Sequence, residues 1–106
     1  SIRQVRKAWE RLRSVARHTP LQYNSTISAE FGAEIHLKRE DLQVVRSYKL
    51  RGAYNFISNR SAEELKNGVV CASAGNHAQG VAYSCQQLGI RGAIFMPNTT
   101  PKQKVT

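Results

Sequence analysis

The first part of the chain carries hydrophobic residues at the spacing of one helix face, with basic residues opposite them. The apolar positions are Ile2, Val5, Trp9, Leu12 and Ala16. Intervals of three and four residues are typical of an amphipathic helix whose apolar stripe packs against other elements. We therefore predict a helix over about residues 2–17, within an amino-terminal amphipathic segment that comprises residues 1–17.

The segment that follows shows shorter elements separated by proline and glycine. Pro20 favours an extended backbone just before it, and we expect Leu21 to anchor this extended segment to the core. Gly32 is expected to end a short helix as its C-terminal glycine. Ile35 and Leu37 alternate with polar residues, and this alternation predicts a strand.

Two helices are predicted in the middle of the chain. The first has Ser47 as its expected N-cap, and its apolar positions are Leu50, Ala53, Tyr54 and Ile57. The second begins with Ser61 and Glu64, which have the spacing of a capping box. Asn67–Gly68 is the expected stop of this second helix.

The rest of the chain reads as strand, tight loop, helix and strand. "GVVCASAGNHAQGVAYSCQQLG" begins with a buried strand and ends in a helix that Gly89 terminates, and "RGAIFMPN" is a second buried strand. A last helix is expected to open at Thr100, with Pro101 in its first turn. Strands that alternate with helices predict right-handed crossovers and an α/β fold with a parallel sheet and flanking helices.

Three predicted strands do not make a complete layered domain. The last predicted helix stops after one turn, and parallel sheets need covering on both faces. We therefore expect the domain to include further elements that cover the sheet.

The charge of the chain is strongly positive. Its 106 residues include 16 Lys and Arg against 7 Asp and Glu, which gives a formal net charge of +9. Such a balance attracts anions, among them nucleic acid, acidic lipid and small phosphorylated or carboxylated molecules. Several of the basic residues lie in the first helix, namely Arg3, Arg6, Lys7, Arg11 and Arg13. Much of the excess is therefore interpreted as one solvated helix face.

Composition also bounds the compartment and excludes some classes. Hydrophobic residues make up 41% of the chain, enough for a core and too many for a disordered segment. Cys71 and Cys85 lack metal-ligand spacing and lie in apolar surroundings, so we interpret them as small buried residues in a reducing compartment. No apolar run approaches the length of a membrane span and no signal-peptide pattern opens the chain. We expect a cytoplasmic protein without a metal site.

The stretch "ASAGNHAQG", residues 72–80, is the first candidate for chemistry. It lies where a strand hands over to a helix, at the carboxyl edge of a parallel sheet, where ligands bind in such folds. Gly75 permits a tight turn, and the free N–H groups at the helix start would bind a carboxylate or phosphate. The alternative is a plain strand–helix turn with Asn76 as N-cap and His77 in a supporting role.

Lys49 is the second candidate. A lysine in the first turn of a helix is unfavourable, because the helix N-terminus carries partial positive charge. Together with Arg46 and Arg51, this potential would disfavour the ammonium form, and burial would act in the same direction. A partly neutral lysine suits Schiff-base chemistry with an aldehyde cofactor. The alternatives are a solvated lysine at a helix end and two solvated arginines beside it.

Three stretches in series match a known family. "EDLQVVRSYKLRGAYNF", "ASAGNHAQGVAYSCQQLGI" and "IFMPNTTPKQKV" resemble, in order, the fold type II (tryptophan synthase β-like) enzymes that use pyridoxal 5'-phosphate. Within these, they are most similar to the biosynthetic threonine dehydratases, also called threonine ammonia-lyases. The resemblance covers about residues 18–106, and it implies that these residues are the incomplete amino-terminal portion of a pyridoxal-phosphate dependent catalytic domain.

The resemblance implies a role for each residue of the two candidates. Lys49, in the motif from Ser47 to Ala53, would form the Schiff base with the cofactor and act as the catalytic base. Tyr48 stands where the family commonly has Phe, beside the cofactor ring. Asn76 would donate a hydrogen bond to the phenolic oxygen of the cofactor. The substrate carboxylate would be held by Ser73, Gly75, Asn76 and His77.

The same resemblance implies a reaction. Threonine would lose its α-proton and its β-hydroxyl, and the product would hydrolyse to 2-oxobutanoate and ammonia. Ala74 stands where serine racemases of this family have a serine, so elimination is expected over racemisation. The substrate is a small amino acid, a parent homo-oligomer (dimer or tetramer) is expected, and neither nucleic acid nor membrane is an expected partner.

Several points stay open from the residues alone. The glycine-rich loop for the cofactor phosphate and the partner of the pyridine nitrogen lie further along chains of this family, so we expect these 106 residues to be inactive alone. Serine dehydratase or serine racemase activity remains possible within the family. The alternatives from other classes are a small basic module that binds nucleic acid and a domain that keeps the fold without the chemistry.

Overall fold

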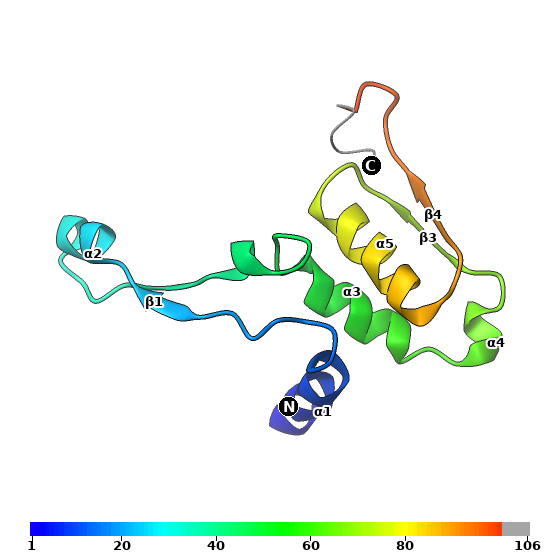
Figure 1. Cartoon of the computed structure of the whole chain (residues 1–106), viewed down its shortest axis with the longest axis horizontal. Coiled ribbons are helices and arrows are strands. Elements are labelled where there is room, and N and C mark those ends of the chain that lie inside the picture. Colours follow the sequence, from blue (N-terminus) through cyan, green and yellow to red (C-terminus); the bar gives the residue numbers. More distant parts are fainter. Residues whose placement is uncertain (101–106) are drawn as a thin grey trace.

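The computed structural model describes residues 1–100 and divides them into an extended arm and a helix–sheet unit (Figure 1). The elements in chain order are α1 (Ile2–Leu12), β1 (Leu21–Tyr23), α2 (Ser25–Phe31), β2 (His36–Lys38), the 3-10 helix η1 (Glu40–Leu42), α3 (Lys49–Ser58), α4 (Ala62–Leu65), β3 (Val69–Ala72), α5 (Asn76–Leu88) and β4 (Gly92–Phe95). The helix predicted from Thr100 onward lies almost wholly outside the described residues.

The arm is a short antiparallel hairpin that encloses α2. β1 pairs with β2 so that Leu21 lies opposite Lys38 and Tyr23 opposite His36. Asn24 caps α2, because its side chain accepts a hydrogen bond of 2.8 Å from the backbone N–H of Ile27. The predicted strand around Ile35 therefore exists, but the expectation that it joins a parallel sheet is wrong, since its partner is the extended segment before α2.

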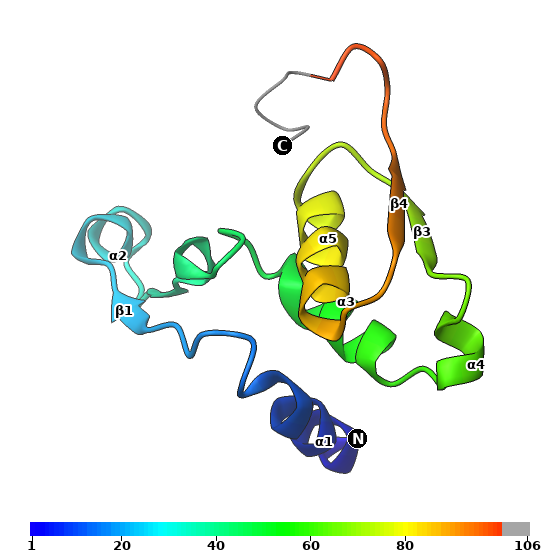
Figure 2. The same ribbon diagram turned by 45° about the vertical axis from the view of Figure 1, so that its right-hand side comes forward.

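The helix–sheet unit holds the parallel pair and the main core. β3 and β4 run parallel, with Val69 opposite Gly92 and Ala72 opposite Phe95. α5 connects the two strands and packs on one face of the pair (Figure 2). Its buried residues meet those of α3 in a cluster of Ala53, Ile57, Val81 and Cys85, against which Val69 and Cys71 pack. The α/β class and the parallel connection predicted from the sequence are confirmed.

The local start and stop signals are confirmed at several helix ends. Ser61 and Glu64 form the predicted capping box of α4. Gly32 ends α2 and Gly89 ends α5, each in the left-handed conformation that glycine adopts without steric cost.

The first helix is shorter than predicted. α1 ends at Leu12. Beyond it, the backbone N–H of Arg17 donates a hydrogen bond of 2.9 Å to the side-chain oxygen of Gln43 instead of continuing a helix. Its basic face is exposed as expected, and Arg11 donates a hydrogen bond of 3.0 Å to the side chain of Asn55 in α3. Its apolar face is also largely open, since Trp9 is 55% exposed.

Other apolar positions expected in the core are exposed. Leu21 is 63% exposed and does not anchor the extended segment. Val70 and Phe95 are 73% and 66% exposed, so the two strands predicted as buried are covered on one face only by the described residues. Cys85 is buried as predicted, while Cys71 is only half-buried, and burial raises the pKa of both free thiols.

Candidate active site

The two candidate segments lie at the same end of the helix–sheet unit. β3 ends at Ala72, and the turn through Ser73 and Gly75 leads directly into α5. α3, which begins with Lys49, runs alongside α5 in the same direction (Figure 1). Both helix N-termini therefore point toward the carboxyl edge of the parallel pair, where ligands bind in α/β folds.

The turn before α5 is organised by one serine. The Oγ atom of Ser73 accepts hydrogen bonds from the backbone N–H groups of Gly75 at 3.2 Å and Ala78 at 3.3 Å. The N-cap position is Gly75, so the alternative reading with Asn76 as the N-cap is wrong. Within the described part of the chain, the backbone N–H groups of Asn76 and His77 have no acceptor. The turn can therefore accept a carboxylate or phosphate oxygen at a helix N-terminus.

Lys49 is the first residue of α3 and is half-buried. Its Nζ atom lies 5.4 Å from the centre of the Tyr48 ring, and the amine has no hydrogen-bond acceptor among residues 1–100. Tyr48 itself is 61% exposed and occupies the N-cap position, so the prediction of Ser47 as N-cap is wrong. A partly buried amine beside an aromatic ring, without a carboxylate partner in the described chain, is available for chemistry with a ligand.

The two arginines that flank Lys49 have different environments. Arg46 is exposed and adopts a left-handed backbone conformation with φ of 60°, which few residues other than glycine adopt. Arg51 instead donates two hydrogen bonds to Glu40, from Nε to Oε2 at 2.9 Å and from Nη2 to Oε1 at 2.8 Å. The sequence predicted that the positive charges of both arginines would disfavour the ammonium form of Lys49. This prediction is wrong for Arg51, because the carboxylate of Glu40 compensates its charge.

Glu40 is the centre of a polar cluster that the sequence did not reveal. The hydrogen bonds from Arg51 lower the pKa of the Glu40 carboxyl to about 2, and a 2.6 Å hydrogen bond from the Thr19 hydroxyl acts in the same direction. Arg51 also donates to the backbone oxygen of Arg17 at 3.2 Å, and the Gln43 side chain bonds the same oxygen at 2.7 Å. These contacts tie the segments before β1 and after η1 to the first turns of α3.

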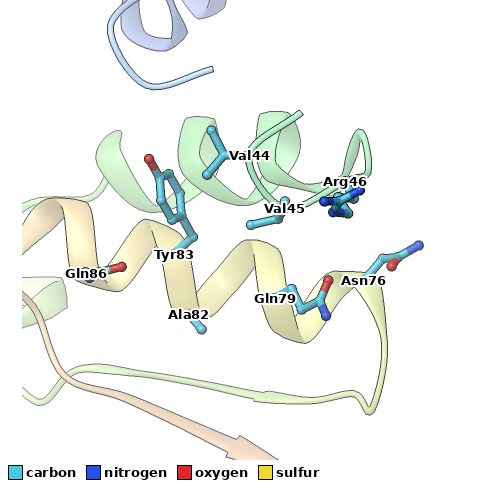
Figure 3. A pocket seen from close by; sticks show the side chains of 8 residues that line it. All are labelled: Val44, Val45, Arg46, Asn76, Gln79, Ala82, Tyr83 and Gln86. Atoms are coloured by element: carbon cyan, nitrogen blue, oxygen red, sulfur yellow. The ribbon is translucent and has the colours of Figure 1, made fainter. Parts of the chain in front are cut away.

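The polar side chains of the turn do not all face one space. Figure 3 shows Asn76 and Gln79 beside Arg46, along a cavity of about 440 Å³ between α5 and the segment before α3. His77 instead lines a smaller, mostly apolar cavity of about 210 Å³ together with α3 and β3. Ser73, Gly75 and Asn76 are therefore in one turn as predicted, whereas the ring of His77 is directed to another face of α5.

Comparison with known proteins places the chain in a family. Residues 12–106 match the family model described as pyridoxal-phosphate dependent enzyme. The L-threonine dehydratase biosynthetic IlvA of Bacillus subtilis (strain 168) is 59% identical over 105 residues, which is 99% of this chain and 25% of that protein. The protein of the same name from Halalkalibacterium halodurans is 64% identical over 94 residues, which is 89% of this chain and 23% of that protein.

Solved structures agree with this assignment. The processed form of threonine deaminase isoform 2 from Solanum lycopersicum superimposes with a TM-score of 0.86 at 46% identity, covering 98% of this chain and 29% of that one. Maize serine racemase gives a TM-score of 0.92 at 34% identity, covering 99% of this chain and 32% of that one. The chain spans about a quarter of the length of the curated relatives it matches. It belongs to the family of pyridoxal-phosphate dependent enzymes.

Proposed function

We propose that the intact protein containing this chain is a pyridoxal-phosphate dependent L-threonine dehydratase, which converts threonine to 2-oxobutanoate and ammonia in isoleucine biosynthesis. Sequence identity supports this reaction, since two proteins named biosynthetic threonine dehydratase are 59% and 64% identical, against 34% for maize serine racemase. Backbone similarity alone does not separate the two reactions, because both kinds of enzyme superimpose well on this chain.

The observation that carries the proposal is the placement of Lys49. Its amine stands at the start of α3, at the same edge as the turn whose Asn76 and His77 amides lack an acceptor within the described chain. An aldehyde cofactor needs such an amine, and the charged groups of cofactor and substrate need such donors. The residues present therefore fit pyridoxal phosphate: Lys49 would be the attachment point, Tyr48 would lie beside the ring, and Asn76 would donate to the phenolic oxygen.

The protein's residues divide the work of the reaction. When bound, pyridoxal phosphate supplies an aldehyde for Schiff-base formation and a ring that withdraws electrons from the α-carbon of the amino acid. The turn from Ser73 to His77 holds the substrate carboxylate and so orients the α-carbon toward Lys49. The Nζ atom of Lys49 would take the α-proton.

The choice between elimination and racemisation is assigned to Ala74. Racemisation requires a second group that returns a proton on the opposite face of the α-carbon. Ala74 has no hydroxyl to serve as that group. Loss of the β-hydroxyl of threonine therefore proceeds without a competing return of the proton on the opposite face of the α-carbon.

The remaining parts of the proposal concern the intact protein. The small amino-acid substrate, a homo-oligomeric assembly and a cytoplasmic location are proposed from the relatives and the reaction. Among the described residues, no helix is long and apolar enough to cross a membrane. The described residues also contain no group of three or more side chains suited to hold a metal ion.

The test is an assay of the intact protein with L-threonine, L-serine and D-serine in the presence of pyridoxal phosphate. We expect 2-oxobutanoate from L-threonine as the main product, and loss of that product in Lys49→Ala. Lys66→Ala is the matched control, because Lys66 is exposed at the C-terminal end of α4, where its amine pairs with Glu63 at 2.6 Å. Interconversion of the serine enantiomers at a higher rate than dehydration of threonine would contradict the proposal.

A further inference from the structure

Gly80 makes the closest approach of α5 to the turn that carries Lys49. Gly80 is buried in the second turn of α5. A Cβ atom added to it would lie 3.1 Å from both the backbone carbon and the backbone oxygen of Lys49, and 3.2 Å from the backbone nitrogen of Leu50. The contact is therefore between Gly80 and the peptide bond that follows Lys49.

Both sides of this contact are held in place. Leu50 is fully buried, so its side chain fixes the peptide bond that precedes it. On the other helix, the hydroxyl of Ser84 donates a hydrogen bond of 2.7 Å to the backbone oxygen of Gly80. Ser84 is itself fully buried. An added methyl group would thus press on backbone atoms rather than on the mobile end of a side chain.

Glycine at this position in α5 lowers the stability of the helix, so its presence there needs a structural explanation. Glycine in the interior of a helix is less favourable than alanine by roughly 0.5–1 kcal/mol. Gly80 does not have the left-handed backbone conformation that would favour glycine over alanine at this position. The close approach of the Lys49 peptide bond is the feature that a larger residue would disturb.

We propose that Gly80 is a positioning residue that sets the place of Lys49 relative to the turn before α5. Gly80 follows Asn76 by about one helical turn, roughly 6 Å along the axis, and it touches the Lys49 peptide bond directly. One contact therefore fixes both the reactive amine and the start of the helix whose free amides face the substrate. This inference rests on the proposed function for the catalytic role of Lys49. The contact between Gly80 and the Lys49 peptide bond is independent of that function.

The test compares Gly80→Ala with Gly52→Ala in the intact protein. Gly52 lies in α3, and a Cβ atom added to it meets nothing within 4 Å in the described part of the chain. Both changes add one methyl group to a helical glycine, and only the first presses on the Lys49 peptide bond. Crystal structures, melting temperatures, steady-state kinetics and the visible absorbance of the cofactor bound to lysine are measured for each variant.

For Gly80→Ala, we expect a folded protein in which the Lys49 peptide bond moves away from α5 by a few tenths of an ångström. A misplacement of about 1 Å at a reacting group can cost about 10²-fold in rate, so we expect kcat to fall by up to about tenfold. We expect a smaller change in KM, a lower lysine-bound absorbance at a given cofactor concentration, and near wild-type values for Gly52→Ala. A merely structural role would lower the melting temperature and leave the absorbance and kcat per folded protein unchanged.

The outcomes separate the two proposals. Wild-type kcat and absorbance in Gly80→Ala, an unmoved Lys49 peptide bond, or a variant that does not fold would each overturn the positioning role. An unmoved peptide bond does so whatever reaction the protein catalyses. A wild-type protein whose cofactor is attached to a residue other than Lys49 would instead contradict the proposed function, and the crystal structures would still decide whether Gly80 sets the Lys49 turn.

Discussion

Replacing Glu40 by glutamine tests whether the ion pair with Arg51 holds the first turns of α3 in place. The substitution keeps the size of the side chain and removes its charge. In the folded chain Glu40 accepts two hydrogen bonds from Arg51 and one from Thr19. Glutamine offers one oxygen and an NH₂ group, so at least one donor of Arg51 would face another donor.

The magnitude follows from the burial and the pKa of Glu40. The Glu40 side chain is 14% exposed and that of Arg51 is 33% exposed. The pKa of the Glu40 carboxyl, about 2, lies well below that of an ordinary glutamate. Each pKa unit corresponds to about 1.4 kcal/mol. Partial screening of Arg51 by solvent reduces the effect. We expect the substitution to destabilise the folded protein by about 2–3 kcal/mol, a fall in Tm of roughly 5 °C.

The effect depends on pH in a defined direction. The carboxyl has a lower pKa in the folded than in the unfolded chain, so its contribution is fully present above the unfolded pKa. The contribution is lost as the pH falls toward about 2, and about half of it is gone near pH 3. The difference in Tm between wild type and Glu40→Gln should therefore be constant near neutral pH and shrink between pH 5 and pH 3.

The assay is thermal unfolding of the intact protein at a series of pH values, with Glu63→Gln as the matched control. Glu63 also pairs with a cation, Lys66, but its side chain is 79% exposed. An exposed pair contributes little to stability, so the control should melt like the wild type. Equal melting temperatures for both variants, or a Glu40→Gln deficit that does not change between pH 5 and pH 3, would refute the reasoning.

Two further substitutions test other parts of the structure. Leu50→Ala removes a fully buried side chain next to Lys49 and should lower the free energy of unfolding by about 2–5 kcal/mol. Leu37→Ala, at a position 36% exposed in β2, should lower it far less. Denaturation curves compare the two variants, and similar losses of stability would contradict the assigned core. Ala74→Ser places a hydroxyl beside the turn before α5 and should raise the rate of serine racemisation relative to threonine dehydration. Chiral chromatography of the products measures that ratio, and an unchanged ratio would argue against the role of Ala74.

The sequence predicted best what is decided locally. The capping box at Ser61, the left-handed glycine at Gly89 and the turn around Gly75 each depend on a few neighbouring residues, and each lies where the pattern placed it. The parallel connection from β3 through α5 to β4 was also predictable, because a short apolar run, a helix and a second apolar run follow one another.

Features that depend on distant residues were not predictable in the same way. The strand around Leu37 pairs with β1, and an alternating pattern does not say which strand is the partner. The apolar pattern predicted that Val70 would be buried, yet it is 73% exposed in the described part of the chain. The pattern does not identify which element would cover it. The pairing of Glu40 with Arg51 joins residues separated by the 3-10 turn of η1 and the left-handed backbone of Arg46, and these local conformations are not evident from the sequence pattern.

One missed residue did leave a signal in the sequence. Gly80 is an isolated glycine inside an otherwise regular helical pattern. Such a residue lowers helix stability, and a tight packing contact is a frequent reason for it. That signal indicates that something comes near, while the identity of the neighbour, the Lys49 peptide bond, is visible only in the folded structure.

The most direct test of the account is to locate the bound cofactor chemically. The intact protein is incubated with pyridoxal phosphate, reduced with borohydride, digested and analysed by mass spectrometry. The account predicts a pyridoxyl group on Lys49, and protection of Lys49 from this labelling when L-threonine is added before reduction. A pyridoxyl group on another lysine, with Lys49 unmodified, would contradict it.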